Sequence, residues 1–520
     1  MATNEQIIGT WILIALYAGV VLYFVVKGAL RVKSMSDYAL GNVNFSPYSV
    51  GLSLAAAMTS AATFVINPGL IANYGISGVL SFGVFFPLAT LLSLTILTKS
   101  FRRFGQSVSA VSLASWMEKR YNSKSFAFFI AFLSVLLITF VVLILVALTK
   151  VFASALNANE VITLAVIVVF VFGYMMFGGA NSMVYTNTIQ AIIMIVVAAI
   201  LIFSGLPHLK EGFGAFLEKL AAIDPVLIRP TNPNSPLFRD FYEIIFAQVV
   251  IGIAVVCQPH IITKSLLLKK EGDVNKFLVT AIVVELLFFS VVIAGLWARM
   301  EFPDLTVNGK SLTNDSIIPT YVVKVFSNGS IATLVGLLVI LGLISAGMST
   351  LEGLIQSLSS SINNDIIKPL WGQKRALSDK QYLTVNRIII AALALVSFLV
   401  ARDQLLHPKL SVAILAQNGV YAYFSIIFVP ILMGIFIKQV RSWIPFLASI
   451  VATITHFSIY YFLPLLHNRY AISFGFFDQY LEGVVRNPAI AASSAIVASV
   501  ILGYGALYIW RLTRQKQQNV

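Results

Sequence analysis

Long apolar stretches separated by short polar segments follow one another along almost the whole chain. Most are close to the roughly 20 residues that a helix needs to cross about 30 Å of hydrocarbon. The pattern therefore predicts an all-α membrane protein with about thirteen membrane-spanning helices. The predicted spans are 7–26, 47–73, 76–98, 126–156, 161–177, 183–206, 240–263, 274–298, 329–361, 386–401, 410–437, 442–466 and 488–510.

The composition supports this interpretation. Hydrophobic residues make up 58% of the 520 residues and charged residues 11%, which excludes an ordinary water-soluble globular protein. No segment has the composition of a separate soluble domain, so we interpret 1–520 as one integral membrane domain. The single cysteine, Cys257, excludes an intrachain disulfide. The basic residues of 1–35 follow its apolar run, which predicts an extra N-terminal helix and not a secretory signal.

The distribution of basic residues predicts how the chain crosses the membrane. If the N-terminus lies outside, 23 of the 35 Lys and Arg residues fall in cytoplasmic segments and eleven on the other side, with Lys150 inside a span. This ratio favours an external N-terminus and a cytoplasmic C-terminus. The net charge of +14 then suits the anionic inner leaflet of the lipid bilayer and requires no nucleic-acid partner.

The second predicted span contains a run of small and hydroxyl-bearing residues. In "SLAAAMTSAATFVINPG" every residue from Ala55 to Thr63 except Met58 is of this kind, and Asn-Pro-Gly follows at 67–69. One interpretation is close helix packing, because small residues let helices approach one another. The other is a helix that unwinds at mid-membrane, where its freed carbonyls can bind a small cation.

The ninth predicted span carries many hydroxyls, in "ISAGMSTLEGLIQSLSSSI". Because positions i, i+3 and i+4 share a helix face, the carbonyl of Ala346 and the hydroxyls of Ser349 and Thr350 can converge. With two carbonyls from a broken second span they make five neutral oxygen ligands, which suit sodium better than zinc or copper. Hydroxyls in membrane helices also commonly bond back to their own helix, so this prediction depends on the broken second span.

The seventh predicted span contains a proline in "VVCQPHIITK". Pro259 removes one backbone hydrogen bond, and Gln258 and His260 flank it. A simple kink with a packed histidine is one interpretation. A second interrupted helix five spans after the first instead predicts two inverted five-helix repeats with a solute bound between them. The predicted parts are a first repeat over 45–206, a second over 238–437, and two C-terminal helices with a cytoplasmic tail over 442–520.

Four stretches resemble the solute:sodium symporter family, and the resemblance covers roughly 36–440. They are "SDYALGNVNFSPYSVGLSLAAAMTSAATFVINPG", "YTNTIQAIIMIV", "QPHIITKSLLLKKEGDVNK" and "LISAGMSTLEGLIQSLSSSINNDI". The resemblance implies the leucine-transporter fold, with the inverted 5+5 repeat in predicted spans two to eleven, and sodium as the coupling ion. It also implies these sodium ligands: the carbonyls of Ala56 and Thr59, with Ala346, Ser349 and Thr350.

The chain departs from the family where some members have a second sodium site. Asn187 stands at the position of their aspartate, and Glu352 at the position of a serine. A carboxylate inside the membrane is costly and is a functional candidate by default. We therefore predict a candidate second cation site at Glu352 and Asn187, with a carboxylate in a water-filled cytoplasmic vestibule as the alternative. Glu285 and Lys150 also lie in predicted spans, and the sequence assigns them no role.

The solute is predicted from the residues around the two broken spans. Sugar-transporting members resemble one another in a Glu-Gln pair where this chain has Ala61 and Ala62, which disfavours a simple sugar. Ser60 and Thr63 instead offer hydroxyl donors at a place where the positive end of a half-helix dipole can face an anionic group. The stretches "QPHI" and "FPDLTV" most resemble the pantothenate and short-chain carboxylate branch, so we predict an organic anion, with sialic acid, a sugar or an amino acid such as proline as alternatives. The predicted solute-binding residues are Ser60, Thr63, Gln258, His260 and Gln417.

Other classes of membrane protein fit the sequence less well. The chain lacks the repeated charged rings of a channel, the HExxH and GxSxG motifs of an intramembrane enzyme, and the GxxxxGK[ST] motif of an ATP-driven pump. We therefore expect no enzymatic activity and no obligate protein partner. A membrane sensor on a transporter scaffold is the remaining alternative, although the tail "RLTRQKQQNV" offers no output module. Short loops and the resemblance together predict a bacterial inner-membrane protein.

Overall fold

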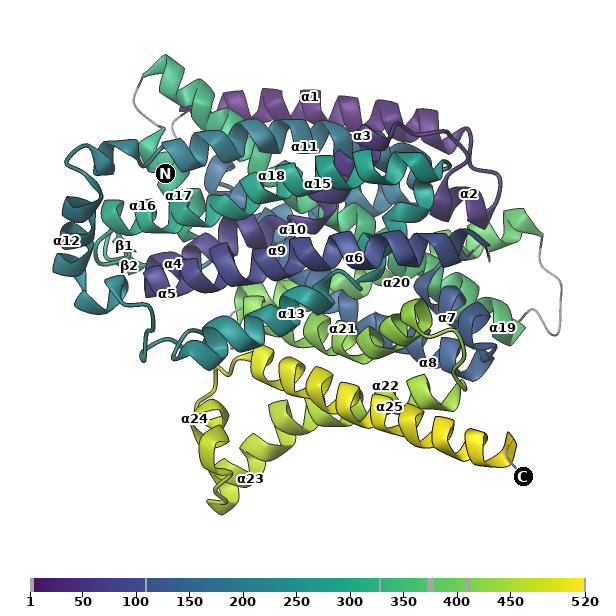
Figure 1. Ribbon diagram of the computed structural model, residues 1–520. Coiled ribbons are helices and arrows are strands. Elements are labelled where there is room, and N and C mark those ends of the chain that lie inside the picture. The colour runs from purple at the N-terminus through teal and green to yellow at the C-terminus, as the bar shows by residue number, and fades with distance from the viewer. Residues whose placement is uncertain (1–3, 108–109, 327–328, 372–377, 408–411, 519–520) are drawn as a thin grey trace.

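Nearly all of the part of the chain that the structure describes is helical, and the helices pack side by side in one bundle (Figure 1). Within this part the only strands are β1 (Thr306–Val307) and β2 (Lys310–Ser311), which pair antiparallel. The computed structural model describes residues 4–107, 110–326, 329–371, 378–407 and 412–518.

For description we divide the helices, in chain order, into three groups, and the short 3₁₀ and π-helical segments among them are labelled η. The first group is α1 (Asn4–Ala29), α2 (Met35–Leu40), α3 (Pro47–Met58), η1 (Ala62–Ile66), α4 (Asn67–Tyr74), α5 (Ile76–Gly78), η2 (Val79–Phe85), α6 (Phe86–Ser107), α7 (Leu113–Tyr121), α8 (Lys124–Leu133), η3 (Ser134–Leu137), α9 (Ile138–Leu156), α10 (Glu160–Met175) and α11 (Ala180–Phe203). The second group is η4 (Leu206–Leu209), α12 (Phe213–Ile223), η5 (Pro225–Ile228), η6 (Tyr242–Ala247), α13 (Gln248–Val255), α14 (Pro259–Ile262), η7 (Thr263–Leu267), η8 (Glu271–Asp273), α15 (Val274–Ser290), η9 (Val291–Ile293), α16 (Ala294–Glu301) and α17 (Ile317–Val325). The third group is α18 (Ser330–Ser361), η10 (Ile362–Ile367), α19 (Lys368–Trp371), α20 (Asp379–Leu406), α21 (Val412–Phe436), α22 (Trp443–Phe457), η11 (Ser458–Phe462), α23 (Leu463–Tyr470), η12 (Gly475–Phe477), α24 (Asp478–Leu481) and α25 (Pro488–Gln518).

The length and composition of these helices confirm an all-α membrane protein. Within the described ranges, ten helices are long and apolar enough to cross a membrane, and two bent pairs raise that number to twelve. The fifth predicted span corresponds to α10, a shorter apolar helix of 16 residues. The start of the predicted span 410–437 lies partly outside the described residues. The count of thirteen spans therefore stays a prediction.

The second predicted span is broken, as the run of small residues indicates. Helix α3 ends at Met58, and Thr59 leaves the helix with extended backbone angles of φ −96° and ψ 102°. The chain becomes helical again in η1 and α4, at 55° to α3. This break confirms the unwound-helix interpretation for the second span, and it leaves the last carbonyls of α3 without partners from their own helix.

The seventh predicted span is broken in the same way. Helix α13 ends at Val255, and Gln258 has non-helical backbone angles, φ −59° and ψ 138°, directly before Pro259, the first residue of α14. Proline is tolerated at the first position of a helix, where its missing N–H is not needed, but it cannot continue a helix that precedes it. The two halves meet at 54°, which confirms a second interrupted span.

Helix α3, the first half of the broken second span, is mostly buried in the bundle. Helix α3 packs against α11, α15 and α18, and α18 also packs against α9. In Figure 1 the N-terminal helix α1 runs along one edge of the bundle, and the C-terminal helices α22 and α25 along the opposite edge. The helices that carry the predicted site residues are thus the enclosed ones.

Candidate functional site

The hydroxyls of α18 meet the freed carbonyls of α3. Ser349 Oγ donates to the carbonyl oxygen of Ala56 at 2.6 Å and lies 3.1 Å from that of Ala346. Thr350 Oγ1 donates to the carbonyl oxygen of Ala57 at 3.1 Å and lies 3.5 Å from that of Ala346. All five residues are completely buried. They bring together five neutral oxygen atoms from two helices, and we call this group the α3–α18 cage.

The chemistry of the α3–α18 cage suits a hard monovalent cation. Carbonyl and hydroxyl oxygens are ligands that sodium accepts, while zinc and copper prefer nitrogen and sulfur. The arrangement also satisfies carbonyls that a broken helix would otherwise leave unpaired in a low-dielectric interior, where such a group is costly. The convergence of the Ala346 carbonyl with the Ser349 and Thr350 hydroxyls is therefore present, as the helical spacing indicates.

Thr59 is the other residue whose carbonyl is predicted to bind sodium, and its side chain contacts Glu285 and not the α3–α18 cage. Its hydroxyl donates to Glu285 Oε2 at 2.8 Å, while Glu285 Oε1 is buried without a hydrogen-bond partner among the described residues. The role of the Thr59 carbonyl stays a prediction. Sequence reasoning missed Ala57, because only its contact with Thr350, 293 residues away, singles it out from its neighbours.

All the predicted solute-binding residues line one cavity between the two broken spans. The five are Ser60, Thr63, Gln258, His260 and Gln417. The apolar part of the wall includes Phe86, Phe140 and Phe289, from α6, α9 and α15. A cavity with a largely apolar wall and a few polar groups is the usual form of a small-molecule site.

The polar groups of this cavity include a helix cap and two buried side-chain atoms without a hydrogen-bond partner among the described residues. Ser60 Oγ accepts from the backbone N–H of Ala62 at 3.1 Å, so it caps the start of the second half-helix. Gln258 Oε1 and His260 Nδ1 are buried and have no hydrogen-bond partner among the described residues. No lysine, arginine, aspartate or glutamate occurs among the described residues that line the cavity. The cavity therefore offers neutral hydrogen-bonding groups and the start of a half-helix.

The predicted second cation site is a dense hydrogen-bond network. Tyr174 Oη donates to Glu352 Oε1 at 2.6 Å, and Gln190 Nε2 lies 3.3 Å from the same oxygen. Thr186 Oγ1 donates to Glu352 Oε2 at 2.6 Å. The Asn187 amide orientation that satisfies its neighbours places its nitrogen 3.1 Å from Glu352 Oε2 and 3.0 Å from Gln190 Oε1. The carboxylate of Glu352 is therefore buried but fully hydrogen-bonded.

A lysine completes this network from the second broken span. Lys264, in η7, is only 3% exposed, although the sequence places it among the basic residues of a cytoplasmic loop. Its Nζ donates to the carbonyl oxygen and to Oγ of Ser53, both at 2.7 Å, and lies 3.0 Å from Asn187 Oδ1. Its spacing of four residues from His260, on one helical face, is the one sequence signal that pointed inward.

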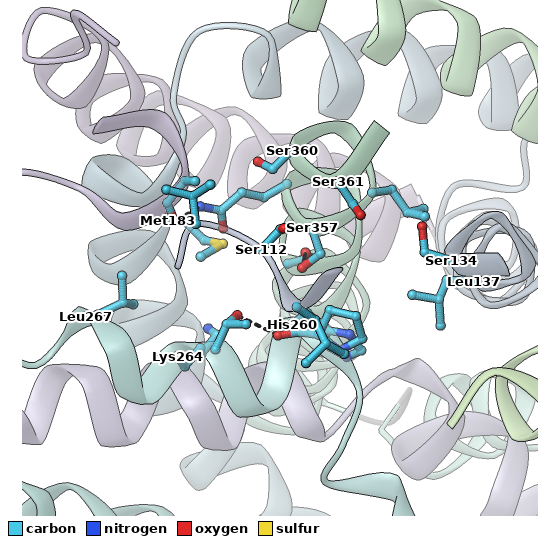
Figure 2. A pocket seen from close by; sticks show the side chains of 18 of the residues that line it. Ser112, Ser134, Leu137, Met183, His260, Lys264, Leu267, Ser357, Ser360 and Ser361 are labelled. Atoms are coloured by element: carbon cyan, nitrogen blue, oxygen red, sulfur yellow. Dashed lines mark hydrogen bonds between the residues drawn. The ribbon is translucent and has the colours of Figure 1, made fainter. Parts of the chain in front are cut away.

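A second pocket lies beside the cavity, because His260 lines both. Figure 2 shows His260 and Lys264 on one segment of chain, with Ser357, Ser360 and Ser361 of α18 across from them. The pocket therefore places a hydroxyl-rich wall next to the cavity between the two broken spans.

Lys150, which the sequence left inside a span, lies near the end of α9. Its Nζ forms an ion pair with Glu160 Oε1 at 2.8 Å, at the start of α10, and the two side chains are 20% and 38% exposed. This pair joins two helix ends and is separate from the sites described above.

Comparison with protein families identifies the class of transporter. Residues 38–451 match the model of the sodium:solute symporter family, so the chain belongs to this family. The family resemblance predicted from the sequence is thus confirmed. Membership implies the use of sodium ion.

Several relatives are known. The chain is 27% identical over 333 residues to a sodium/pantothenate symporter of Haemophilus influenzae, covering 62% of this chain and 65% of that protein. It is 27% identical over 301 residues to the sodium/pantothenate symporter of Escherichia coli, covering 55% and 60%. It is 24% identical over 419 residues to a sodium/proline symporter of Staphylococcus aureus, covering 77% of each. The match thus spans less than two thirds of the two pantothenate symporters.

The fold is shared with a solved transporter. The structure of a Na⁺-coupled sialic acid symporter in a substrate-bound outward-open state superposes with a TM-score of 0.72 at 18% identity. The similarity covers 95% of this chain and 96% of that one. It confirms the predicted leucine-transporter-type fold class.

Proposed function

We propose that the chain is a secondary active transporter that couples the entry of a small organic anion to the entry of sodium by alternating access. The observation that carries the proposal is the α3–α18 cage, in which Ser349 and Thr350 reach the carbonyls of Ala56 and Ala57. Sodium would replace these two direct hydrogen bonds by coordinating the oxygens from both sides. Membership in the sodium:solute symporter family supports the same assignment.

The coupling follows from the position of the α3–α18 cage in the chain. We assign 45–206 and 238–437 as the two repeats, since each of these ranges begins with a broken span. The α3–α18 cage then joins the first repeat to the second. Sodium that binds there stabilises the state in which the two repeats are together and the solute cavity is formed, so sodium and solute raise each other's affinity. Each sodium ion that enters contributes roughly 2.3 kcal/mol per 100 mV of membrane potential.

The cavity favours a carboxylate as the solute. The half-helix start at Ser60 and the amide N–H groups of Gln417 suit an anion. Gln258 Nε2 donates one N–H to the carbonyl oxygen of Val255 at 3.3 Å and keeps its second N–H for the solute. An amino acid would in addition bring an ammonium group, and no acidic side chain lines the cavity among the described residues. Ala61 and Ala62 offer a sugar no bidentate partner. The unpaired Oε1 of Gln258 fits a solute that also carries a hydroxyl or amide N–H, as pantothenate does.

We further propose that the N-terminus lies outside, the C-terminus in the cytoplasm, and the protein in a bacterial inner membrane. The excess of basic residues in the alternate loops supports the orientation. The pocket that carries Ser357, Ser360 and Ser361 then faces the cytoplasm and forms the exit route.

The test is uptake by proteoliposomes that contain the purified protein. Labelled acetate, pantothenate, proline, sialic acid and glucose are offered with and without an inward sodium gradient, to the wild type and to the double variant Ser349→Ala/Thr350→Ala. We expect sodium-driven uptake of one carboxylate by the wild type and its loss in the double variant. Uptake that ignores sodium, or that survives in the double variant, would overturn the proposed mechanism.

A further inference from the structure

Lys264 places its amino group inside the bundle. The residue comes from the second broken span and is 3% exposed, and its Nζ contacts Ser53 of α3 and Asn187 of α11. An ammonium has three N–H donors. The three acceptors around it are the carbonyl oxygen of Ser53, Ser53 Oγ and Asn187 Oδ1, at 2.7, 2.7 and 3.0 Å. All three donors therefore have a partner.

The carboxylate of Glu352 is connected to Lys264 through the side-chain amide of Asn187. Asn187 accepts from Lys264 with its oxygen and donates to Glu352 Oε2 with its nitrogen. The remaining positions around the carboxylate are taken by Tyr174, Thr186 and Gln190. One positive and one negative charge are thus connected through a neutral amide. We call this group the lysine network: Lys264, Ser53, Asn187, Glu352, Tyr174, Thr186 and Gln190.

The lysine network already has what a bound sodium ion would bring. The ammonium is surrounded by oxygen atoms, with a carboxylate nearby, and a monovalent metal ion accepts the same surroundings. A tethered ammonium competes with free ions at a very high effective concentration. Sodium could enter only by displacing it and leaving its charge buried without partners, which is costly. The α3–α18 cage, by contrast, consists of neutral oxygens and contains no cation of its own.

We propose that Lys264 is a permanent substitute for a second sodium ion. Its ammonium fills the Glu352–Asn187 site, so that sodium binds at the α3–α18 cage alone and the coupling uses one sodium ion. This inference rests on the proposed sodium-coupled function and defines its ion stoichiometry. It replaces the prediction of a second mobile cation at Glu352 and Asn187.

The experiment measures sodium binding without any solute. Tryptophan-fluorescence melting curves of the purified protein in detergent are recorded over a range of NaCl concentrations, with choline chloride holding the ionic strength constant. A ligand that binds the folded state raises the melting temperature as its concentration exceeds its dissociation constant. The variants are Lys264→Met, Ser349→Ala/Thr350→Ala, the triple combination of these, and Lys264→Met/Glu352→Gln.

For the wild type we expect a single saturable rise of the melting temperature with sodium, which Ser349→Ala/Thr350→Ala removes. Lys264→Met should melt lower in choline, because Glu352 loses its counter-charge, and should gain a second sodium-dependent rise. That second rise should persist in the triple variant and be absent from Lys264→Met/Glu352→Gln. A triple variant with no response to sodium would overturn the inference.

Two further outcomes keep the inference separate from the proposed function. If Lys264→Met does not fold, the variant Glu352→Gln in the otherwise unchanged chain tests the inference. A smaller sodium-dependent rise of its melting temperature, or a lower Hill slope, would show sodium at Glu352 and overturn the inference. An unchanged rise supports it. If instead Ser349→Ala/Thr350→Ala keeps the full sodium response of the wild type, the assigned sodium site is wrong. Only that last result contradicts the proposed function.

Discussion

Removing the hydroxyl of Ser349 should weaken sodium binding strongly, while removing that of Ser345 should not. Both side chains are completely buried on α18. Ser345 Oγ donates at 2.8 Å to the carbonyl oxygen of Leu341, four residues earlier in its own helix. Ser349 Oγ instead reaches across to Ala56 at 2.6 Å. The pair Ser349→Ala and Ser345→Ala therefore removes the same atom from the same helix, once at the α3–α18 cage and once away from it.

The size of the expected shift in sodium affinity follows from the cost of leaving a buried oxygen of the α3–α18 cage without the Ser349 hydroxyl. Leaving a buried polar group unsatisfied costs about 1–3 kcal/mol. If the sodium-bound state loses that much, the half-saturating sodium concentration rises by about 5- to 150-fold in Ser349→Ala. Ser345→Ala removes the bond within its helix and a side-chain hydrogen bond with Tyr17 of α1, neither of which reaches the α3–α18 cage. Losses of about 0.5 kcal/mol there should keep its shift in sodium dependence below about threefold.

The assay is the sodium dependence of solute uptake in proteoliposomes at constant ionic strength, supported by the sodium dependence of the melting temperature. Ser345→Ala reports any general loss of stability in α18, so the quantity of interest is the difference between the two variants. Equal shifts in the two variants, or an unchanged sodium dependence in Ser349→Ala, would refute the assignment of Ser349 as a sodium ligand.

Three further predictions test the packing and the solute cavity. A Cβ at Gly295 would lie 2.1 Å from the carbonyl oxygen of Pro68, so Gly295→Ala should cost about 1–3 kcal/mol of stability. Gly173→Ala, with open space around the new methyl group, is its control, and a similar drop in melting temperature in both would contradict the packing. Gln417→Ala should raise the solute KM about tenfold, equivalent to about 1.4 kcal/mol, while sodium binding measured without solute stays the same; a changed sodium affinity would argue against its role. Cys257 is fully buried, so its thiol should react with N-ethylmaleimide only after denaturation, and rapid labelling of the native protein would be inconsistent with the fold.

The broken spans could be predicted because their causes are local. Pro259 lacks the N–H that a continuing helix needs, and Ser60 has a hydroxyl that can cap a new helix start, where it accepts from the N–H of Ala62 at 3.1 Å. The structure places both breaks at these positions, where α3 ends at Met58 and α14 begins at Pro259. Local chemistry therefore determined where the chain leaves the helix.

The register between helices was not predictable in the same way. Spacing within α18 predicted that Ser349 and Thr350 share a face with the carbonyl of Ala346, but not which carbonyls of α3 they would meet. That choice depends on how two helices, 293 residues apart for both contacts, slide and rotate against each other. Only the folded structure brings Ala57 to Thr350.

Lys264 shows a second limit of the sequence. Counted with its basic neighbours, it belongs to a cytoplasmic loop, since an isolated lysine inside a membrane protein is costly. Its burial becomes tolerable only with acceptors from α3 and α11, namely Ser53 and Asn187, which are distant in the sequence. For the same reason Tyr174 and Thr186 could not be recognised as partners of Glu352.

Sodium and solute should move through this protein together. Measuring the fluxes of both in the same proteoliposomes tests that coupling directly. Proteoliposomes with an inward sodium gradient receive ²²Na⁺ and the labelled carboxylate identified in the uptake panel, and both are counted over time. We expect solute to accumulate above its equilibrium level only while the sodium gradient lasts, and to accelerate ²²Na⁺ entry. Solute that merely equilibrates, or ²²Na⁺ entry that is independent of solute, would contradict sodium-coupled symport.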